Sequence, residues 1–113
     1  MIVQISNTTK LSPGNCEIFD FTLEHNHLYR IYAMSDCVEN SMKIRQQCYM
    51  EIYNEHSKKV AESKENSGLE CFISLFGNNE PIKLKIFVFR EKTSFNSYEP
   101  ALEVKVLAFE MKS

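Results

Sequence analysis

Two histidines separated by one residue are the side chains of this sequence best suited to metal chemistry. His25 and His27 flank Asn26, and residues two apart in an extended segment project to the same side. Imidazole nitrogens bind Zn²⁺ and related ions, so the pair could share one metal if a third ligand came from elsewhere. The simpler interpretation is two solvated histidines in a turn. The possible third ligands are Glu24, Asp36, His56 and the cysteines.

Other groups capable of chemistry are dispersed along the chain. Asp20, Glu24 and Asp36 carry oxygen ligands for calcium, but they lack the dense D-x-D-x-D spacing of a calcium loop, which favours solvated carboxylates. A cysteine–histidine hydrolase has no local signature here. Glycine-rich phosphate loops and the G-x-S-x-G motif are absent from the sequence. The residues therefore favour a binding protein over an enzyme.

The four cysteines do not form a recognisable metal or redox motif. Cys16, Cys37, Cys48 and Cys71 are widely spaced and include no C-x-x-C pair, which gives zinc-ribbon and redox functions little support. They could form two disulfides in three ways. Because Cys48 and Cys71 are in phase with apolar neighbours, we expect them to be small core residues with free thiols.

Length and charge exclude several classes of partner. A chain of 113 residues can bury a core without disulfides or metal. With 13 basic and 15 acidic residues, the net charge of −2 provides no basic surface for a phosphate backbone, so nucleic acid is not an expected partner. The N-terminal residues show no charged leader followed by an apolar stretch, and no run is long enough to span a membrane. We expect a cytoplasmic protein, or a secreted one if a leader has been removed, without membrane contact.

The elements that must position these groups are strands. From residue 14 to residue 36, apolar residues alternate with polar ones in two segments joined by the polar turn 24 to 27. A period of two is typical of strands with one buried face, and the short turn predicts that the two segments form a β-hairpin. The residues expected to face the core are Phe19, Phe21, Leu23, Tyr29, Ile31 and Ala33.

Alternation continues in the second half of the chain. Short strands are expected at 59 to 62 and 69 to 75, while residues 37 to 46 fit a short helix or an irregular crossover, of which we favour the crossover. Further inward-facing sets are Cys48, Met50 and Ile52; Ile82, Leu84, Ile86 and Val88; and Leu102, Val104, Val106 and Ala108. About eight strands at close spacing, counting an opening strand at the N-terminus, predict a single domain over residues 1–113, an antiparallel β-sandwich of jelly-roll type.

Aromatic residues out of phase with the core mark the most distinctive surface. If residues 82 to 90 pair with 102 to 110, their outward faces mix rings with lysine and glutamate, a composition that recurs at protein interfaces. The alternative is that the N-terminal strand or the loop 91 to 100 covers these rings. The predicted interface residues are Phe87, Phe89, Leu107 and Phe109, with Tyr49 and Tyr53 extending them.

Several segments together resemble a known kind of module. The strings CEIFDFTLE, LYRIYAMSD, MEIYNEHSKKVAES and KLKIFVF follow one another as the strands of pre-peptidase C-terminal and emp24-like β-sandwich modules do. Ser57 stands where those modules have a turn glycine, and Asn79-Glu80-Pro81 stands in place of a glycine-aromatic signature. The resemblance implies a non-catalytic accessory or interaction module, sometimes supported by calcium.

The sequence as a whole therefore predicts a non-catalytic interaction module. It would act by binding a protein, with self-association through Phe87, Phe89, Leu107 and Phe109 as the specific hypothesis, and it would need no cofactor. Docking on a carbohydrate is a further possibility that the sequence does not separate from protein binding. The alternative class is a small metal-dependent enzyme or metal-binding protein that uses the His25 and His27 turn.

Overall fold

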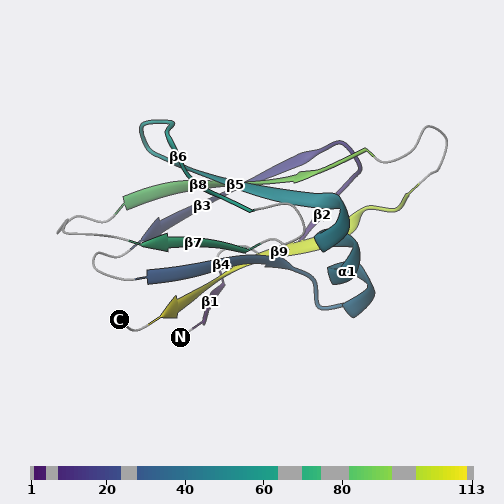
Figure 1. Cartoon of the computed structure of the whole chain (residues 1–113). Helices are drawn as coiled ribbons and strands as arrows, with labels where there is room; N and C mark the ends of the chain where they lie inside the picture. Colours follow the sequence, from purple (N-terminus) through teal and green to yellow (C-terminus); the bar gives the residue numbers. More distant parts are fainter. Residues whose placement is uncertain are drawn as a thin grey trace.

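The chain folds as an antiparallel β-sandwich. The structure, a computed structural model, describes residues 2–4, 8–23, 28–63, 70–74, 82–92 and 99–111. In this part of the chain, nine strands form two sheets that stack as layers, and a single helix closes one end (Figure 1). The prediction of an all-β sandwich is confirmed. None of the helical residues described here forms a segment long and apolar enough to cross a membrane.

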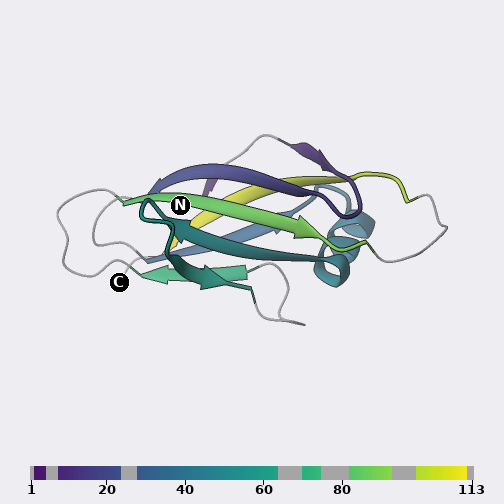
Figure 2. The same ribbon diagram turned by 90° about the horizontal axis from the view of Figure 1, so that it is seen from above.

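Each sheet combines strands from both halves of the chain. The order of the first sheet is β1-β9-β4-β7, with β2 also pairing with β9, and the order of the second is β3-β8-β5-β6. Figure 2 shows the second sheet from above, with β8 between β3 and β5. The first sheet comprises β1 (Ile2–Gln4), β2 (Thr9–Leu11), β4 (Leu28–Met34), β7 (Glu70–Ser74) and β9 (Leu102–Met111). The second comprises β3 (Cys16–Leu23), β5 (Cys48–Asn54), β6 (Lys59–Glu62) and β8 (Ile82–Arg90).

The core lies between the sheets and follows the predicted alternation. Residues two apart on a strand share a face, so the inward side chains of both sheets meet in one apolar layer. On β8 the predicted residues Leu84, Ile86 and Val88 are buried, and Ile82 packs against them partly exposed. The predicted inward residues of the other strands that are buried are Phe19, Tyr29, Ile31, Ala33, Met50, Ile52, Leu102, Val104, Val106 and Ala108.

The predicted hairpin between residues 14 and 36 is wrong. Strand β3 pairs with β8, while β4 pairs with β7 and β9 in the other sheet. The two strands alternate as expected, but alternation marks the face of a strand and does not identify its neighbour. Each segment instead pairs with a long strand from the C-terminal half of the chain.

Residues 37 to 46 also differ from the favoured interpretation. They fall largely within helix α1 (Val38–Gln47), which connects β4 of the first sheet to β5 of the second. Ile44 is the buried residue of the helix. The hydroxyl of Ser41, in the first half of the helix, donates to the carbonyl of Ser35 at 2.9 Å and accepts from its N–H at 3.1 Å, which fixes the bend between β4 and the helix.

Strand β8 ends in a buried arginine that joins three segments. Arg90 follows Val88 in the inward phase, and its guanidinium donates to the carbonyls of Leu11 at 2.7 Å and Pro100 at 3.0 Å. It also donates to the Glu99 carboxylate at 2.9 Å and to the Gln47 side chain at 3.2 Å. A buried charge needs such partners to offset its desolvation, and these bonds connect β2, the end of α1 and the approach to β9.

Candidate functional site

Four aromatic rings form a row on the outer face of the second sheet. Strand pairing places Tyr49 of β5 opposite Phe89 of β8, and the two rings stack with centroids 4.8 Å apart. Phe89 lies parallel to Phe87 at 6.0 Å, and Phe87 meets Tyr53 edge to face at 5.2 Å. We call Tyr49, Phe89, Phe87 and Tyr53 the aromatic ladder. Stacked and edge-to-face pairs of this kind add about 0.5–1.5 kcal/mol each beyond the area they bury.

The aromatic ladder remains open to solvent. Tyr49 is 41% exposed and the other three rings are half-buried. On the neighbouring strand, Ile18 of β3 lies opposite Phe87 and is 53% exposed, so the apolar surface extends across three strands. Such a continuous exposed patch is uncommon on a protein surface that has no partner.

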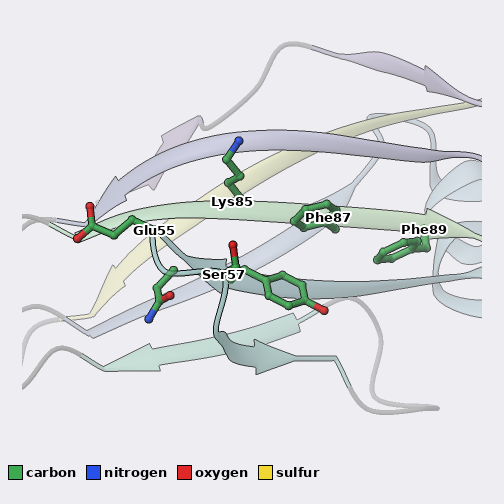
Figure 3. Close-up of a pocket in the computed structure, with 7 residues that line it drawn as sticks. Glu55, Ser57, Lys85, Phe87 and Phe89 are labelled. Atoms are coloured by element: carbon green, nitrogen blue, oxygen red, sulfur yellow. The ribbon is translucent and has the colours of Figure 1, made fainter.

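A hollow of about 360 Å³ lies at one end of the ladder. Its apolar side is formed by Tyr53, Phe87 and Phe89, and its polar side by the turn between β5 and β6 together with Lys85 of β8. Figure 3 shows Phe87 and Phe89 extending along β8 from Lys85, with Ser57 of the turn near Lys85 and the Glu55 side chain pointing away from the rings. The hollow is partly open to solvent, which suits one protruding side chain better than an enclosed ligand.

Charged side chains border the rings. The ammonium group of Lys59 pairs with the carboxylate of Glu51 and lies 3.2 Å from that of Glu62. These hydrogen bonds, to Glu51 first and Glu62 second, raise the pKa of Lys59. Lys85, at the hollow, has no ion pair with another residue that the structure describes. Glu51 lies opposite Phe87, between Tyr49 and Tyr53 on β5, so this ion pair brings charge into the row of rings, whereas Lys85 lies at the hollow.

The predicted interface residues do not share one face. Strand β8 pairs with β3 and β5, and β9 pairs with β1, β2 and β4, so the assumed pairing of β8 with β9 is wrong. Phe87 and Phe89 are on the outer face of one sheet, while Leu107 and Phe109 are on the outer face of the other. Phe109 is 41% exposed and Leu107 is half-buried. The structure therefore joins Tyr49 and Tyr53 to Phe87 and Phe89, and separates the other pair.

The alternative that the N-terminal strand covers these rings is wrong for the ladder. Strands β1 and β2 both pair with β9 in the opposite sheet. Most of the loop 91 to 100, the other proposed cover, lies outside the described residues.

The predicted metal ligands His25 and His27 lie outside the described residues, as does Glu24. Across the ranges that the structure describes, no three histidine, cysteine or acidic side chains come together as metal ligands. Asp20 is on β3, whereas Asp36 follows β4 and pairs with Lys105 of β9. Asp20 and Asp36, two of the carboxylates considered for calcium, are thus attached to strands of different sheets.

The described thiols are free. Cys16 and Cys37 are exposed, and Cys48 is partly buried against the core, which confirms the expectation for Cys48. Burial raises the pKa of the Cys48 thiol to about 11, although the positive charge of Arg90 acts in the opposite direction. The Cys71 side chain lies outside the described residues. A thiol held neutral in this way is a poor nucleophile.

Two features of this site were missed in the sequence. Ile18 was not singled out, although it is out of phase with Phe19 and Phe21 and so had to face outward. Arg90 was also not identified, although it continues the inward series of Leu84, Ile86 and Val88.

Comparison with known proteins adds no further information, since no protein-family model matches the chain and a search of curated proteins finds no match.

Proposed function

We propose that this chain is a non-catalytic interaction module that binds a protein through the aromatic ladder. The observation that supports the proposal is the row of Tyr49, Phe89, Phe87 and Tyr53, exposed on the outer face of a sheet. Tyrosine and phenylalanine are enriched at the centres of protein interfaces, where they contribute large contact areas at low entropic cost.

The arrangement of charges supports a protein partner. Interfaces commonly combine apolar side chains with charged groups that set orientation. Lys85 lies at the hollow, and Glu51 lies within the row opposite Phe87, where it pairs with Lys59 of β6. The mostly apolar hollow beside Phe87 would take one side chain of the partner as an anchor. Carbohydrate binding has less support, because Asn54 of the hollow already uses its side-chain oxygen to accept from His56 and Lys58 within the turn.

The test compares equally exposed residues on opposite faces. Tyr49 and Phe109 are each 41% exposed, the first on the ladder and the second on the outer face of the other sheet. We expect Tyr49→Ser and Phe87→Ser to weaken binding to a protein captured by the wild-type chain at least about tenfold, the usual effect of truncating a central interface residue. Phe109→Ser should leave the affinity unchanged.

Urea unfolding of each variant controls for loss of structure. If Phe109→Ser weakens binding as much as Tyr49→Ser, or if both ladder variants bind as the wild type does, the proposal is wrong. Self-association through the ladder is the second form of the same proposal, and in that case Phe87→Ser would lower the solution mass while Phe109→Ser would not.

We also propose the jelly-roll type for this sandwich and kinship with the pre-peptidase C-terminal and emp24-like modules. The strand orders β1-β9-β4-β7 and β3-β8-β5-β6 support the first, because each interleaves early strands with late ones. Ser57 supports the second, since it has a φ of 60° at the turn position where those modules have glycine.

A further inference from the structure

In the part of the chain that the structure describes, strand β3 is an edge of the second sheet. Among the described residues it pairs with β8 alone, at the beginning of the order β3-β8-β5-β6. In Figure 2 it runs along the outer side of β8. Its register with β8 is unbroken over eight residues, Cys16–Leu23. Edge strands in native proteins are usually protected by proline, charged side chains or a bulge. Strand β3 has no proline, lysine or bulge, and its charged residues are Glu17 and Asp20.

The backbone groups on this open edge can be identified. The N–H of Arg90 donates to the carbonyl of Asn15 at 2.9 Å, so the backbone of residue 15 faces β8. Along an antiparallel pair this direction alternates from residue to residue. The backbone groups of Cys16, Ile18, Asp20 and Thr22 therefore point to the open edge, and their side chains lie on the ladder side of the sheet. An added strand is the partner that satisfies such a row.

Side-chain complementarity favours the pairing of β3 with the β3 strand of a second copy in one particular register. In an antiparallel pair of two β3 strands, the register is centred on the residue that lies opposite its own copy. Most of the strand stays paired when this residue is Ile18, Phe19, Asp20 or Phe21. The register centred on Asp20 places two carboxylates opposite each other, and the one centred on Phe19 places Ile18 opposite Asp20, both unfavourable. The register centred on Phe21 leaves Ile18 without an apolar partner. Centred on Ile18, the pair opposes Ile18 to Ile18 and Cys16 to Asp20, with no like charges facing. On the inner face it opposes Glu17 to Phe19, but the register centred on Phe19 also places Glu17 opposite a phenylalanine, Phe21.

We propose that two copies of this chain pair through their β3 edges with Ile18 opposite Ile18. The two second sheets then form one continuous sheet with both aromatic ladders on the same side. A row of Phe87, Ile18, Ile18 and Phe87 crosses the junction, because Ile18 lies opposite Phe87 within each copy. This pairing lowers the exposure of Ile18, which is 53% exposed in the single chain. It uses the edge rather than the ladder, so it does not rest on the proposed protein binding.

Disulfide trapping tests the register. In a background with Cys16→Ser and Cys37→Ser, which removes the exposed thiols that the structure describes, Ile18→Cys places two thiols on directly opposite residues. Their Cα atoms are about 5.5 Å apart, which is within disulfide range. Thr22→Cys is the matched control, since Thr22 is exposed on the same strand and face, but the two Thr22 residues would be about 27 Å apart in this register. Under mild oxidation we expect a crosslinked dimer for Ile18→Cys at least about ten times faster than for Thr22→Cys, a difference set by this separation. Equal crosslinking of both variants, or none of either, would overturn the proposal.

A charge exchange tests the same contact without oxidation. Light scattering over a concentration series should show dimers for the wild type, and monomers for Ile18→Lys and for Ile18→Glu, because each variant places like charges opposite each other. Mixing the two variants should restore the dimer mass, since lysine then faces glutamate. A wild type that stays monomeric, variants that dimerise as the wild type does, or a mixture that stays monomeric would each contradict the β3 pairing. Restored mass on mixing also shows that both variants are folded.

Discussion

At the scale of single residues, Arg90 shows how one charged side chain can connect segments distant in sequence. Arg90 is 3% exposed, and its guanidinium donates to groups of Leu11, Gln47, Glu99 and Pro100. A guanidinium is suited to this position because its planar fork offers five donors, more than an ammonium group can direct. The ends of β2, α1 and β8 are thereby held together at one end of the sandwich.

Replacement of Arg90 should therefore be costly. Arg90→Met retains much of the side-chain volume but leaves the Glu99 carboxylate and two backbone carbonyls without this donor. We expect the free energy of unfolding to fall by about 3 kcal/mol, the usual range for breaking a buried charge network. Urea denaturation measures it. Arg90→Lys should also be destabilising, and a loss under about 1 kcal/mol for Arg90→Met would show that the network contributes little.

Cys48 should make the stability depend on pH in the alkaline range. Its pKa is about 11 in the folded chain, above the ordinary thiol value of 9.0. At a pH below the ordinary pKa, the thiol is neutral in both the folded and the unfolded chain. At higher pH the thiol of the unfolded chain ionises first, and this ionisation stabilises the unfolded state. Stability should therefore decrease as the pH rises through this interval. Cys48→Ser should reduce that decrease in urea unfolding, and Cys37→Ser, at an exposed thiol, should not; an identical pH dependence of wild type and Cys48→Ser would contradict the assignment.

At the scale of elements, the sequence indicated which face of each strand is buried but did not indicate which strands pair with each other. The period of two correctly identified the buried sides of β3, β4, β5, β8 and β9, because strand geometry alone sets that pattern. It also marked Tyr49, Tyr53, Phe87 and Phe89 as outward. Their assembly into one ladder depends on the pairing of β5 with β8, which alternation does not specify. The same limitation produced the incorrect hairpin and the incorrect pairing of β8 with β9.

The turn between β5 and β6 offers a second prediction. Ser57 has a φ of 60°, a left-handed conformation that costs a residue with a Cβ about 1–2 kcal/mol. The turn is maintained by the Asn54 side chain, which accepts from the backbone N–H of His56 and of Lys58. Ser57→Gly should raise the free energy of unfolding by about 0.5–1 kcal/mol after allowing for the greater freedom of glycine in the unfolded chain.

Ser57→Ala is the matched control for this change. It removes the same hydroxyl but keeps the Cβ, so it should give no such gain. Thermal unfolding of both variants measures the difference. Equal stability of the glycine and alanine variants would show that the left-handed backbone is not strained at this turn.

At the scale of the whole molecule, the strand order places the ladder residues on one outer face and Leu107 with Phe109 on the opposite one. The aromatic ladder lies on the β3-β8-β5-β6 sheet, and Leu107 with Phe109 lies on the sheet that contains β9. The outward phase of all these residues could be predicted from sequence. Their separation could not, because it follows from which of the long strands share a sheet. A partner bound at the ladder should accordingly leave the opposite face accessible.

Hydroxyl-radical footprinting of the chain with and without a captured protein partner tests the proposed binding face most directly. Tyr49 and Phe109, each 41% exposed, are matched reporters of the two outer faces. The ladder model predicts that the partner lowers the oxidation rate of Tyr49, and of Phe87 and Phe89 beside it, while Phe109 is oxidised as in the free chain. Protection of Phe109 with unchanged oxidation of Tyr49 would contradict it and assign binding to the opposite sheet.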